Sequence, residues 1–231
     1  MAPTAQRYGR TFTGLGRGAK RLALTYDDGP NDPHTLSLLE LLAKHNVKAT
    51  FFLIGRYVQQ FPQIAREIVA AGHVVGNHTF THPLLIFKSP KEIRVELSDC
   101  HRALVDAVGE PSRLFRPPFG GRRPEVLRIA RQLGLLPVMW SVTGYDWKAP
   151  SAEYIEKKVS SRIRGGDVIL LHDGGHLRTG EDRRHTITAT DRLIGRLKEE
   201  GYEFVTVPQM MAESGPGISS APEPTVSNSF L

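Results

Sequence analysis

Short apolar runs that alternate with helix-like segments are the feature that most constrains the fold of this chain. Strands covered on both faces read as nearly continuous apolar runs. Strands that alternate with helices build parallel βα units with right-handed crossovers. The pattern therefore predicts an α/β fold with a closed or nearly closed barrel; a doubly wound open sheet is the alternative. The expected strands are Leu22–Tyr26, Ala49–Ile54, His73–Gly76, Leu114–Arg116, Leu136–Ser141, Val168–His172 and Glu203–Val207.

Apolar residues at three-to-four spacing predict the helices between these runs. With 231 residues, 40% of them hydrophobic, the chain is long enough for one sizeable core and short enough for one domain. The polar, glycine-rich connection 173–184 is long for a compact domain and is a candidate lid or rim. The expected helices are Thr35–His45, Ile64–Ala71, Lys91–Val108, Glu125–Leu133, Ala152–Arg164 and Thr186–Glu200.

Three regions follow from composition: a basic arm at 1–20, an ordered domain at 21–210 and a disordered tail at 211–231. The arm carries four positive charges and no acidic residue. It could favour an anionic polymer or nucleic acid, but a solvated terminus is the more common case, so no nucleic-acid partner is expected. The single cysteine, Cys100, excludes an intrachain disulfide and a cysteine zinc cluster.

No apolar run is long enough to span a membrane, and no signal-peptide centre is present. As written, the sequence is that of a soluble protein, and its compartment stays open: cytoplasmic as it stands, extracytoplasmic if a leader was removed or the chain was trimmed. The sequence does not indicate an oligomeric state.

Ionisable residues gather where the predicted strands end, which is where the reactive groups of parallel barrels lie. In TYDDGP, Asp27 and Asp28 follow the first strand, and neighbouring strand residues point to opposite faces. In NHTFTHP, His78 and His82 are four residues apart, a spacing that suits Zn²⁺ or a similar first-row divalent ion. Two histidines that merely cap a turn are the simpler alternative for this motif taken alone.

Together these residues predict a metal site of one carboxylate and two imidazoles. If the chain leaves strand geometry at Gly29-Pro30, Asp28 can complete the ligand set with His78 and His82. Asp27 then stays unligated as the base for the water that the ion activates, with Arg116 as a charge partner that keeps it ionised.

A proton donor is predicted at the end of VILLH, where Leu170 and His172 share one strand face. His172 could protonate a leaving nitrogen, and Asp146 could hold the imidazole and raise its pKa. Trp147 and Leu170 could wall a small apolar slot, although a core tryptophan is an equal alternative. His176 and His185 lie near these motifs and could touch a substrate, but surface or packing roles are the more common ones.

Five ordered motifs together resemble the polysaccharide deacetylase family, also called carbohydrate esterase family 4 or the NodB homology domain. They are TYDDGP, HTFTHP, RPPFG at Arg116–Gly120, the pair Asp146-Trp147, and LLHD at Leu170–Asp173. Two departures, Thr143 where many members have Asp and Phe119 where many have Tyr, affect substrate contacts rather than the metal or acid–base residues.

The resemblance implies a distorted (β/α)7 barrel and a hydrolase that needs one divalent metal, zinc, cobalt or nickel. It assigns the metal to Asp28, His78 and His82, the base to Asp27 and the acid to His172, with Arg116 and Asp146 as their partners. From the resemblance alone, the Phe119 N–H holds the oxyanion, and Trp147 with Leu170 lines the acetyl pocket.

The expected function is removal of N-acetyl groups from an N-acetylglucosamine-containing glycan, such as a chitooligosaccharide or peptidoglycan. An enzyme that hydrolyses small amides or cyclic imides is one alternative. A non-catalytic glycan-binding domain is another, although a pure binder has no need for a matched acid and base.

Overall fold

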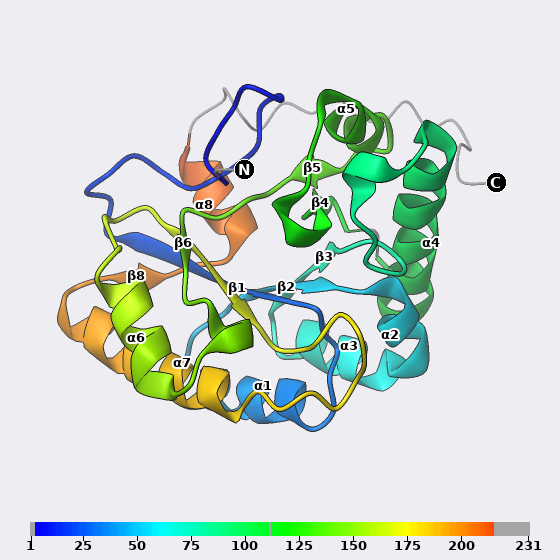
Figure 1. Ribbon diagram of the computed structural model, residues 1–231. Coiled ribbons are helices and arrows are strands. Elements are labelled where there is room, and N and C mark those ends of the chain that lie inside the picture. Colours follow the sequence, from blue (N-terminus) through cyan, green and yellow to red (C-terminus); the bar gives the residue numbers. More distant parts are fainter. Residues whose placement is uncertain (1–2, 111, 215–231) are drawn as a thin grey trace.

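The computed structural model describes residues 3–110 and 112–214, and a curled, parallel seven-strand sheet forms its centre (Figure 1). The strands lie in the order β5-β4-β3-β2-β1-β7-β6, and β8 pairs only with the start of β1. This half-open barrel in one domain confirms the predicted fold class. The strands are β1 Arg21–Asp27, β2 Thr50–Leu53, β3 Val74–Asn77, β4 Leu114–Phe115, β5 Leu136–Pro137, β6 Val142–Thr143, β7 Val168–His172 and β8 Glu203–Phe204.

Eight α-helices and three short 3-10 helices connect the strands of the described residues and cover the outer face of the sheet (Figure 1). The α-helices are α1 His34–Lys44, α2 Gly55–Gln60, α3 Pro62–Ala70, α4 Pro90–Val108, α5 Pro124–Gln132, α6 Ala152–Ser160, α7 Arg184–Glu199 and α8 Val207–Glu213. The 3-10 helices are η1 Leu85–Phe87, η2 Pro118–Gly120 and η3 Asp146–Lys148.

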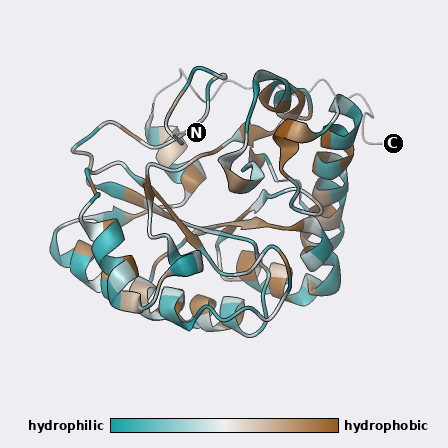
Figure 2. Cartoon of the chain, viewed as in Figure 1, coloured by the Kyte–Doolittle hydropathy of each residue, from teal (hydrophilic) through white to brown (hydrophobic). Residues whose placement is uncertain are grey.

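Alternation along β1 divides the core into an outer and an inner layer. Leu22, Leu24 and Tyr26 face the surrounding helices, whereas Ala23 packs inside the barrel. Figure 2 shows largely apolar strands at the centre and helices whose hydrophilic residues lie on their outer side. Because side chains alternate with period two, Thr25 and Asp27 share the inner face with Ala23. The carboxylate of Asp27 is thereby placed at the top of the barrel interior.

The helix and strand predictions differ from the structure where elements are very short. The strand β6 was not predicted, and only Glu203–Phe204 of the expected strand Glu203–Val207 forms a strand, β8. Val207 instead begins α8, whose capping box is made by Thr206 and Gln209. The predicted strand Leu136–Ser141 is reduced to β5, because its later residues bend away toward β6.

The two ends of the chain also take part in the core. Phe12, in the segment predicted as a basic arm, is only 2% exposed and packs in the barrel interior with Val138 and Val168. The arm is therefore not simply a solvated terminus. Residues 211–213 of the predicted tail belong to α8, and residues 215–231 lie outside the described part of the chain.

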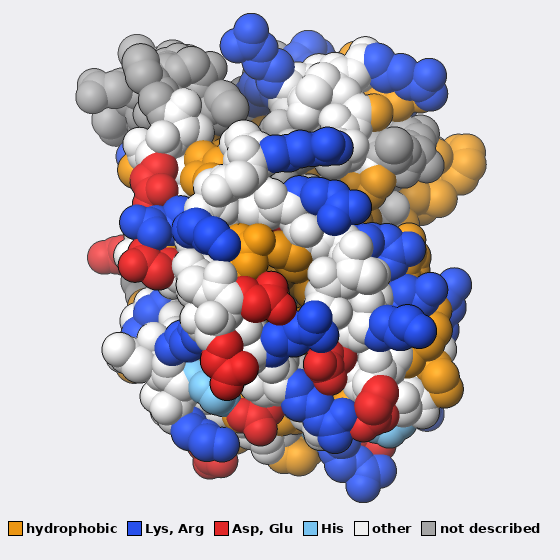
Figure 3. All heavy atoms as spheres, turned by 90° about the vertical axis from the view of Figure 1, so that its left-hand side faces the viewer, with side chains coloured by type: hydrophobic (Ala, Val, Ile, Leu, Met, Phe, Trp, Pro, Cys, Tyr) orange, Lys and Arg blue, Asp and Glu red, His pale blue; other side chains and the backbone are white. Residues whose placement is uncertain are grey.

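The surface carries mixed charge. On the face shown in Figure 3, Lys and Arg side chains are interspersed with Asp and Glu and form no continuous basic stripe. Within residues 3–110 and 112–214, no helix combines the length and apolar character needed to cross a membrane.

Two glycines test the packing of this fold. A Cβ on Gly76 in β3 would lie 2.5 Å from the Phe52 ring, whereas a Cβ on Gly195 in α7 would meet no atom within 4 Å. We expect Gly76→Ala to lower the free energy of unfolding by about 1–3 kcal/mol through overpacking. Gly195→Ala should raise it by up to about 1 kcal/mol, because alanine favours the helix. Urea denaturation measures both; equal effects would contradict the tight packing of Gly76 against Phe52.

Candidate active site

The two adjacent aspartates point to one place because the chain leaves strand geometry between them. Asp27 is the last residue of β1, and Asp28 has a φ of 75°, in the left-handed region. The departure from the strand therefore occurs at Asp28, one residue before the predicted Gly29-Pro30. Both carboxylates are buried, with 3% and 4% exposure.

The two histidines of the second motif lie against Asp28. The Nε2 atoms of His82 and His78 lie 3.1 and 3.5 Å from Asp28 Oδ1. The ligand atoms of all three residues lie within 4.8 Å of one another. His82 has a φ of 63° and His78 follows β3, so a turn rather than a helix brings the two rings together.

The donor set fits a divalent cation. His78 Nδ1 lies 2.7 Å from the Arg116 carbonyl oxygen, which can only accept, so Nδ1 carries the hydrogen. The Nε2 of a neutral His78 is then a bare lone pair aimed at Asp28 Oδ1, a buried oxygen that accepts no hydrogen bond. Lone pairs that face one another in a buried site require a positive charge between them. Two imidazoles and one carboxylate suit Zn²⁺ and similar ions.

The charge states of these groups agree with that reading. Burial opposes ionisation of Asp28, but positive charge placed between its carboxylate and the His78 and His82 rings, whether a proton on a ring or a bound cation, holds the pKa of its carboxyl well below the usual range. Burial lowers the pKa of His82 despite the nearby Asp28 carboxylate. A neutral imidazole and an ionised carboxylate are the forms that bind a metal.

Arg116 holds the second aspartate. Its Nη1 donates to Asp27 Oδ1 and to Thr25 Oγ1, each at 2.7 Å, and its side chain is fully buried. The guanidinium lies 4.1 Å from the centre of the Phe52 ring. Asp27 Oδ2 is left facing the metal group, 3.6 Å from His78 Nε2. The predicted pairing of Arg116 with Asp27 is therefore present in the geometry.

His172 ends β7, and Asp146 in η3 holds it at two points. Asp146 Oδ1 lies 2.9 Å from His172 Nδ1, and Oδ2 accepts from the His172 backbone N–H at 2.7 Å. Thr186 in α7 also donates to Asp146 Oδ2. Burial disfavours the charged imidazole, but the attraction of the Asp146 carboxylate prevails and raises the pKa of His172 to about 9. The Asp146 carboxylate therefore favours the protonated form of His172.

A cavity of about 450 Å³ joins these groups. Asp27, Asp28 and His172 line it together with the apolar side chains of Trp147 and Leu170. The Trp147 and His172 rings meet edge to face, with centroids 5.2 Å apart, so Trp147 is a cavity wall, 46% exposed, rather than a core residue. Phe119 also lines the cavity; it has a φ of 56°, and the centroid of its ring lies 4.6 Å from that of His82.

The connection 173–184 forms a rim that Asn31 fastens to the turn after β1. The Asn31 amide donates to the carbonyls of Asp173 and Glu181 and accepts from the Gly180 N–H. Asp173 is itself buried and accepts from Thr35, and burial raises the pKa of its carboxyl to about 7.

Sequence reasoning missed Asn31, Thr35 and Asp173 as supporting residues. The only sequence signal for them was their place inside or beside two of the motifs.

His176, Leu177 and Trp140 also line the cavity and were not assigned to it from sequence. The His176 ring stacks on that of His82, with centroids 4.9 Å apart. The only sequence signal for His176 was its place four residues after His172. His185, by contrast, is exposed on α7.

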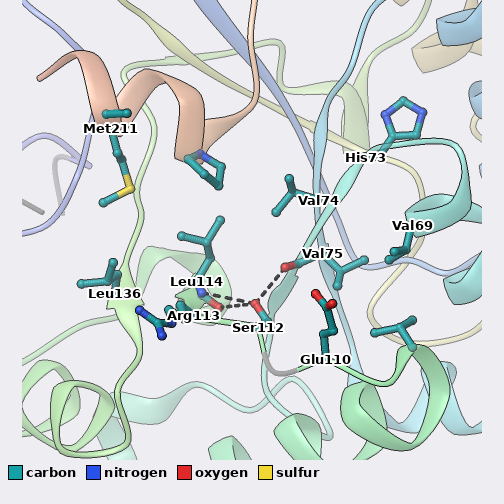
Figure 4. Close-up of a pocket in the computed structure, with 13 residues that line it drawn as sticks. Val69, His73, Val74, Val75, Glu110, Ser112, Arg113, Leu114, Leu136 and Met211 are labelled. Atoms are coloured by element: carbon teal, nitrogen blue, oxygen red, sulfur yellow. Dashed lines mark hydrogen bonds between the residues drawn. The ribbon is translucent and has the colours of Figure 1, made fainter. Parts of the chain in front are cut away.

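A second hollow, of about 470 Å³, lies at the opposite ends of the strands (Figure 4). Val74, Leu114 and Leu136, each at or near the start of a strand, line it, and Ser112 bonds to the Val75 carbonyl across its floor. The metal-type group found among the described residues belongs to the first cavity.

Metal binding tests this geometry directly. We expect Asp28→Ala to weaken Zn²⁺ binding more than about 100-fold, because losing a ligand exceeds the cost of losing a supporting residue. Asp27→Asn should stay within about tenfold of the unaltered protein, since Asp27 only neighbours the ion. Competition with a chromophoric chelator measures both affinities. Equal Zn²⁺ affinity in all three proteins would rule out Asp28 as a ligand.

Comparisons with known proteins agree with this site. A family model described as polysaccharide deacetylase matches residues 15–138. A peptidoglycan-N-acetylglucosamine deacetylase of Bacillus cereus is 38% identical over 211 residues, covering 90% of this chain and 74% of that protein. A chitooligosaccharide deacetylase of Sinorhizobium fredii is 39% identical over 208 residues, covering 87% and 97%.

Solved structures show the same relationship. The Bc1960 peptidoglycan N-acetylglucosamine deacetylase matches with a TM-score of 0.80 and 38% identity, covering 87% of this chain and 91% of that one. BA3943, described as a CE4 family pseudoenzyme from Bacillus anthracis, matches with a TM-score of 0.80 and 34% identity, covering 87% and 69%. The fold, the ordered motifs and these similarities place the chain in the polysaccharide deacetylase family, carbohydrate esterase family 4.

Proposed function

We propose that this protein is a metal-dependent hydrolase that removes N-acetyl groups from N-acetylglucosamine-containing glycans, such as chitooligosaccharides or peptidoglycan. One observation carries the proposal: a proton acceptor, a proton donor and a metal-type ligand group face one cavity, each held by its own buried partner. The named relatives act on such glycans, which supports the substrate class.

Asp27 is the general base in this proposal. Arg116 occupies Oδ1, so the remaining oxygen, Oδ2, is available to take a proton on the cavity side. A Zn²⁺ ion held by Asp28, His78 and His82 would supply Lewis acidity, which makes a water molecule more acidic and polarises a carbonyl oxygen. Asp27 accepts the proton that water loses as its oxygen attacks the amide carbon.

His172 is the general acid. Its Nδ1 is engaged with Asp146, so Nε2 is the nitrogen that can give a proton to the substrate. Protonation of the amide nitrogen lets the C–N bond break, which yields acetate and the free amine of the sugar. The Phe119 N–H is assigned to the oxyanion that forms between these steps, by resemblance to the family.

The rim of the cavity suits a sugar. Phe119, Trp147 and Leu177 are 58%, 46% and 79% exposed, unusual values for large apolar side chains, and all three line the cavity. Exposed apolar surface beside a polar site is typical of ligand contact. Sugar rings have apolar C–H faces that stack on such side chains. Leu170, buried beside Trp147, then lines the pocket for the acetyl methyl group.

An activity assay distinguishes two other functions from the proposed one. Hydrolysis of small amides or cyclic imides needs the same metal and acid–base groups but not the exposed rim. A non-catalytic glycan-binding domain is a real alternative because a relative of the same fold is described as a pseudoenzyme. It would bind chitotetraose in the presence of Zn²⁺ without releasing acetate.

Turnover should depend on Asp27. We expect Asp27→Asn to lower kcat for acetate release from chitotetraose by about 10²–10⁴, the usual contribution of a general base, with Zn²⁺ retained. Asp106→Asn, a change on the exposed face of α4, is the matched control and should leave kcat unchanged. The assay runs on chitotetraose, peptidoglycan fragments and a cyclic imide, with and without EDTA. An Asp27→Asn protein as fast as the control would remove Asp27 as the base.

The pH profile should report the pairing of His172 with Asp146. His172 must be protonated to act as an acid, so activity falls as the pH rises through its pKa, which Asp146 raises to about 9. Asp146→Asn removes the negative charge, lowers that pKa and shifts the alkaline limb of the kcat profile to lower pH. An alkaline limb at the same pH in both proteins would show that another group controls it.

A further inference from the structure

The N-terminal segment crosses an opening in the barrel. The sheet ends at β5 on one side and β6 on the other, and Figure 1 shows the N-terminal segment, in dark blue, beside this opening. Phe12 donates to the Pro137 carbonyl and accepts from the Met139 N–H, at 2.9 and 2.7 Å. Three residues later, Leu15 donates to the Gly166 carbonyl, just before β7. The segment thereby links the edge strand β5 to the turn that precedes β7, the neighbour of the other edge strand, β6.

The stretch that Phe12 pairs with also supports Arg116. The Arg116 guanidinium donates to the carbonyls of Val138 and Met139, each at 3.4 Å, while its Nη1 holds Asp27. Phe12 thus fixes the outer edge of the same short stretch whose carbonyls receive Arg116. The Phe12 ring packs against Val138 in the barrel interior.

Arg122 provides a second link, to the turn that carries Phe119. Its side chain is fully buried; Nη1 donates to the Gly120 carbonyl at 3.2 Å, and Nη2 donates to the carbonyls of Pro3 and Ala5 at 2.9 and 2.8 Å. A buried cation that loses its carbonyl partners is costly. The guanidinium therefore holds the N-terminal segment and the Phe119–Gly120 turn in a fixed relation.

We propose that the segment Pro3–Leu15 is a positioning element of the active site and that Arg122 is the positioning residue that couples it to the Phe119 turn. The segment reaches the chemistry from two sides: through Met139 to the Arg116–Asp27 pair, and through Arg122 to the Phe119 N–H. The catalytic unit then begins near Pro3 rather than at residue 21. The kinetic part of this inference rests on the proposed deacetylase activity; the structural coupling does not.

The test compares Arg122→Met with Arg123→Met in the full, Zn²⁺-loaded chain. Arg123 is the neighbouring arginine and also donates to a main-chain carbonyl, but that carbonyl belongs to Lys88 and not to the N-terminal segment. We expect Arg122→Met to speed amide hydrogen exchange at Phe12, Gly120 and Gly121. It should also lower kcat on chitotetraose by about 10- to 100-fold, the cost of misplacing a reacting geometry.

Three further readouts separate positioning from loss of structure. KM should change by less than about threefold, because the oxyanion forms only in the transition state. Zn²⁺ affinity should stay unchanged, because the ligands lie just after β1 and β3. Arg122→Lys should recover part of the lost kcat, since an ammonium group also donates to carbonyls. If Arg122→Met does not fold, Phe12→Ala serves as a second variant that leaves Arg122 in place. It should speed amide hydrogen exchange at Met139 and lower kcat.

The proposal would be overturned if the Arg122→Met protein matched the Arg123→Met protein in both amide hydrogen exchange and kcat. Faster exchange with unchanged kcat would overturn it as well, because the segment would then be structural only. If the unaltered protein releases no acetate from any glycan, the proposed function fails. Hydrogen exchange at Gly120 and Gly121 then decides the coupling on its own: unchanged exchange in Arg122→Met rejects it.

Discussion

The fully buried guanidinium of Arg116 is the interaction on which the active site depends. The guanidinium binds Asp27 and Thr25 of β1, a carbonyl that follows β5 and the face of the Phe52 ring. The main-chain carbonyl of Arg116 fixes the tautomer of His78. Taking a cation out of water costs several kcal/mol unless its hydrogen bonds are satisfied. Every one of these partners therefore constrains the others, and the proposed base and one proposed metal ligand are positioned by the same residue.

The long elements and the site residues could be predicted from sequence because they carry strong local patterns. The run VILLH predicts β7 with its observed bounds, since four apolar residues before a histidine form a buried strand that ends at the barrel rim. β6 could not be predicted, because a two-residue strand, Val142–Thr143, has no periodicity. The apolar pattern predicts a strand that ends at Val207, whereas Thr206 caps a helix that begins there; the capping box was the sequence signal for this helix.

The supporting residues of the site are set by tertiary contacts that no spacing reveals. Asn31 and Asp173 are 142 residues apart, and His176 meets His82 only after the rim has folded over the cavity. Phe12 shows the same limit: its burial results from an opening between β5 and β6 that composition cannot indicate. Fold alone also does not decide activity, since a relative of similar structure is described as a pseudoenzyme, so the case for catalysis rests on particular side chains.

The way Asn31 holds the rim has a consequence for divergence among proteins built on this plan. The three rim atoms that its side-chain amide binds are all main-chain atoms: two carbonyls and one N–H. These hydrogen bonds do not depend on the side chains of the loop. Residues such as Leu177 can therefore be substituted while the loop backbone stays held in place. Tolerance to replacement is thereby concentrated at the surface that meets a substrate, and new preferences can arise there while the reaction centre is left intact.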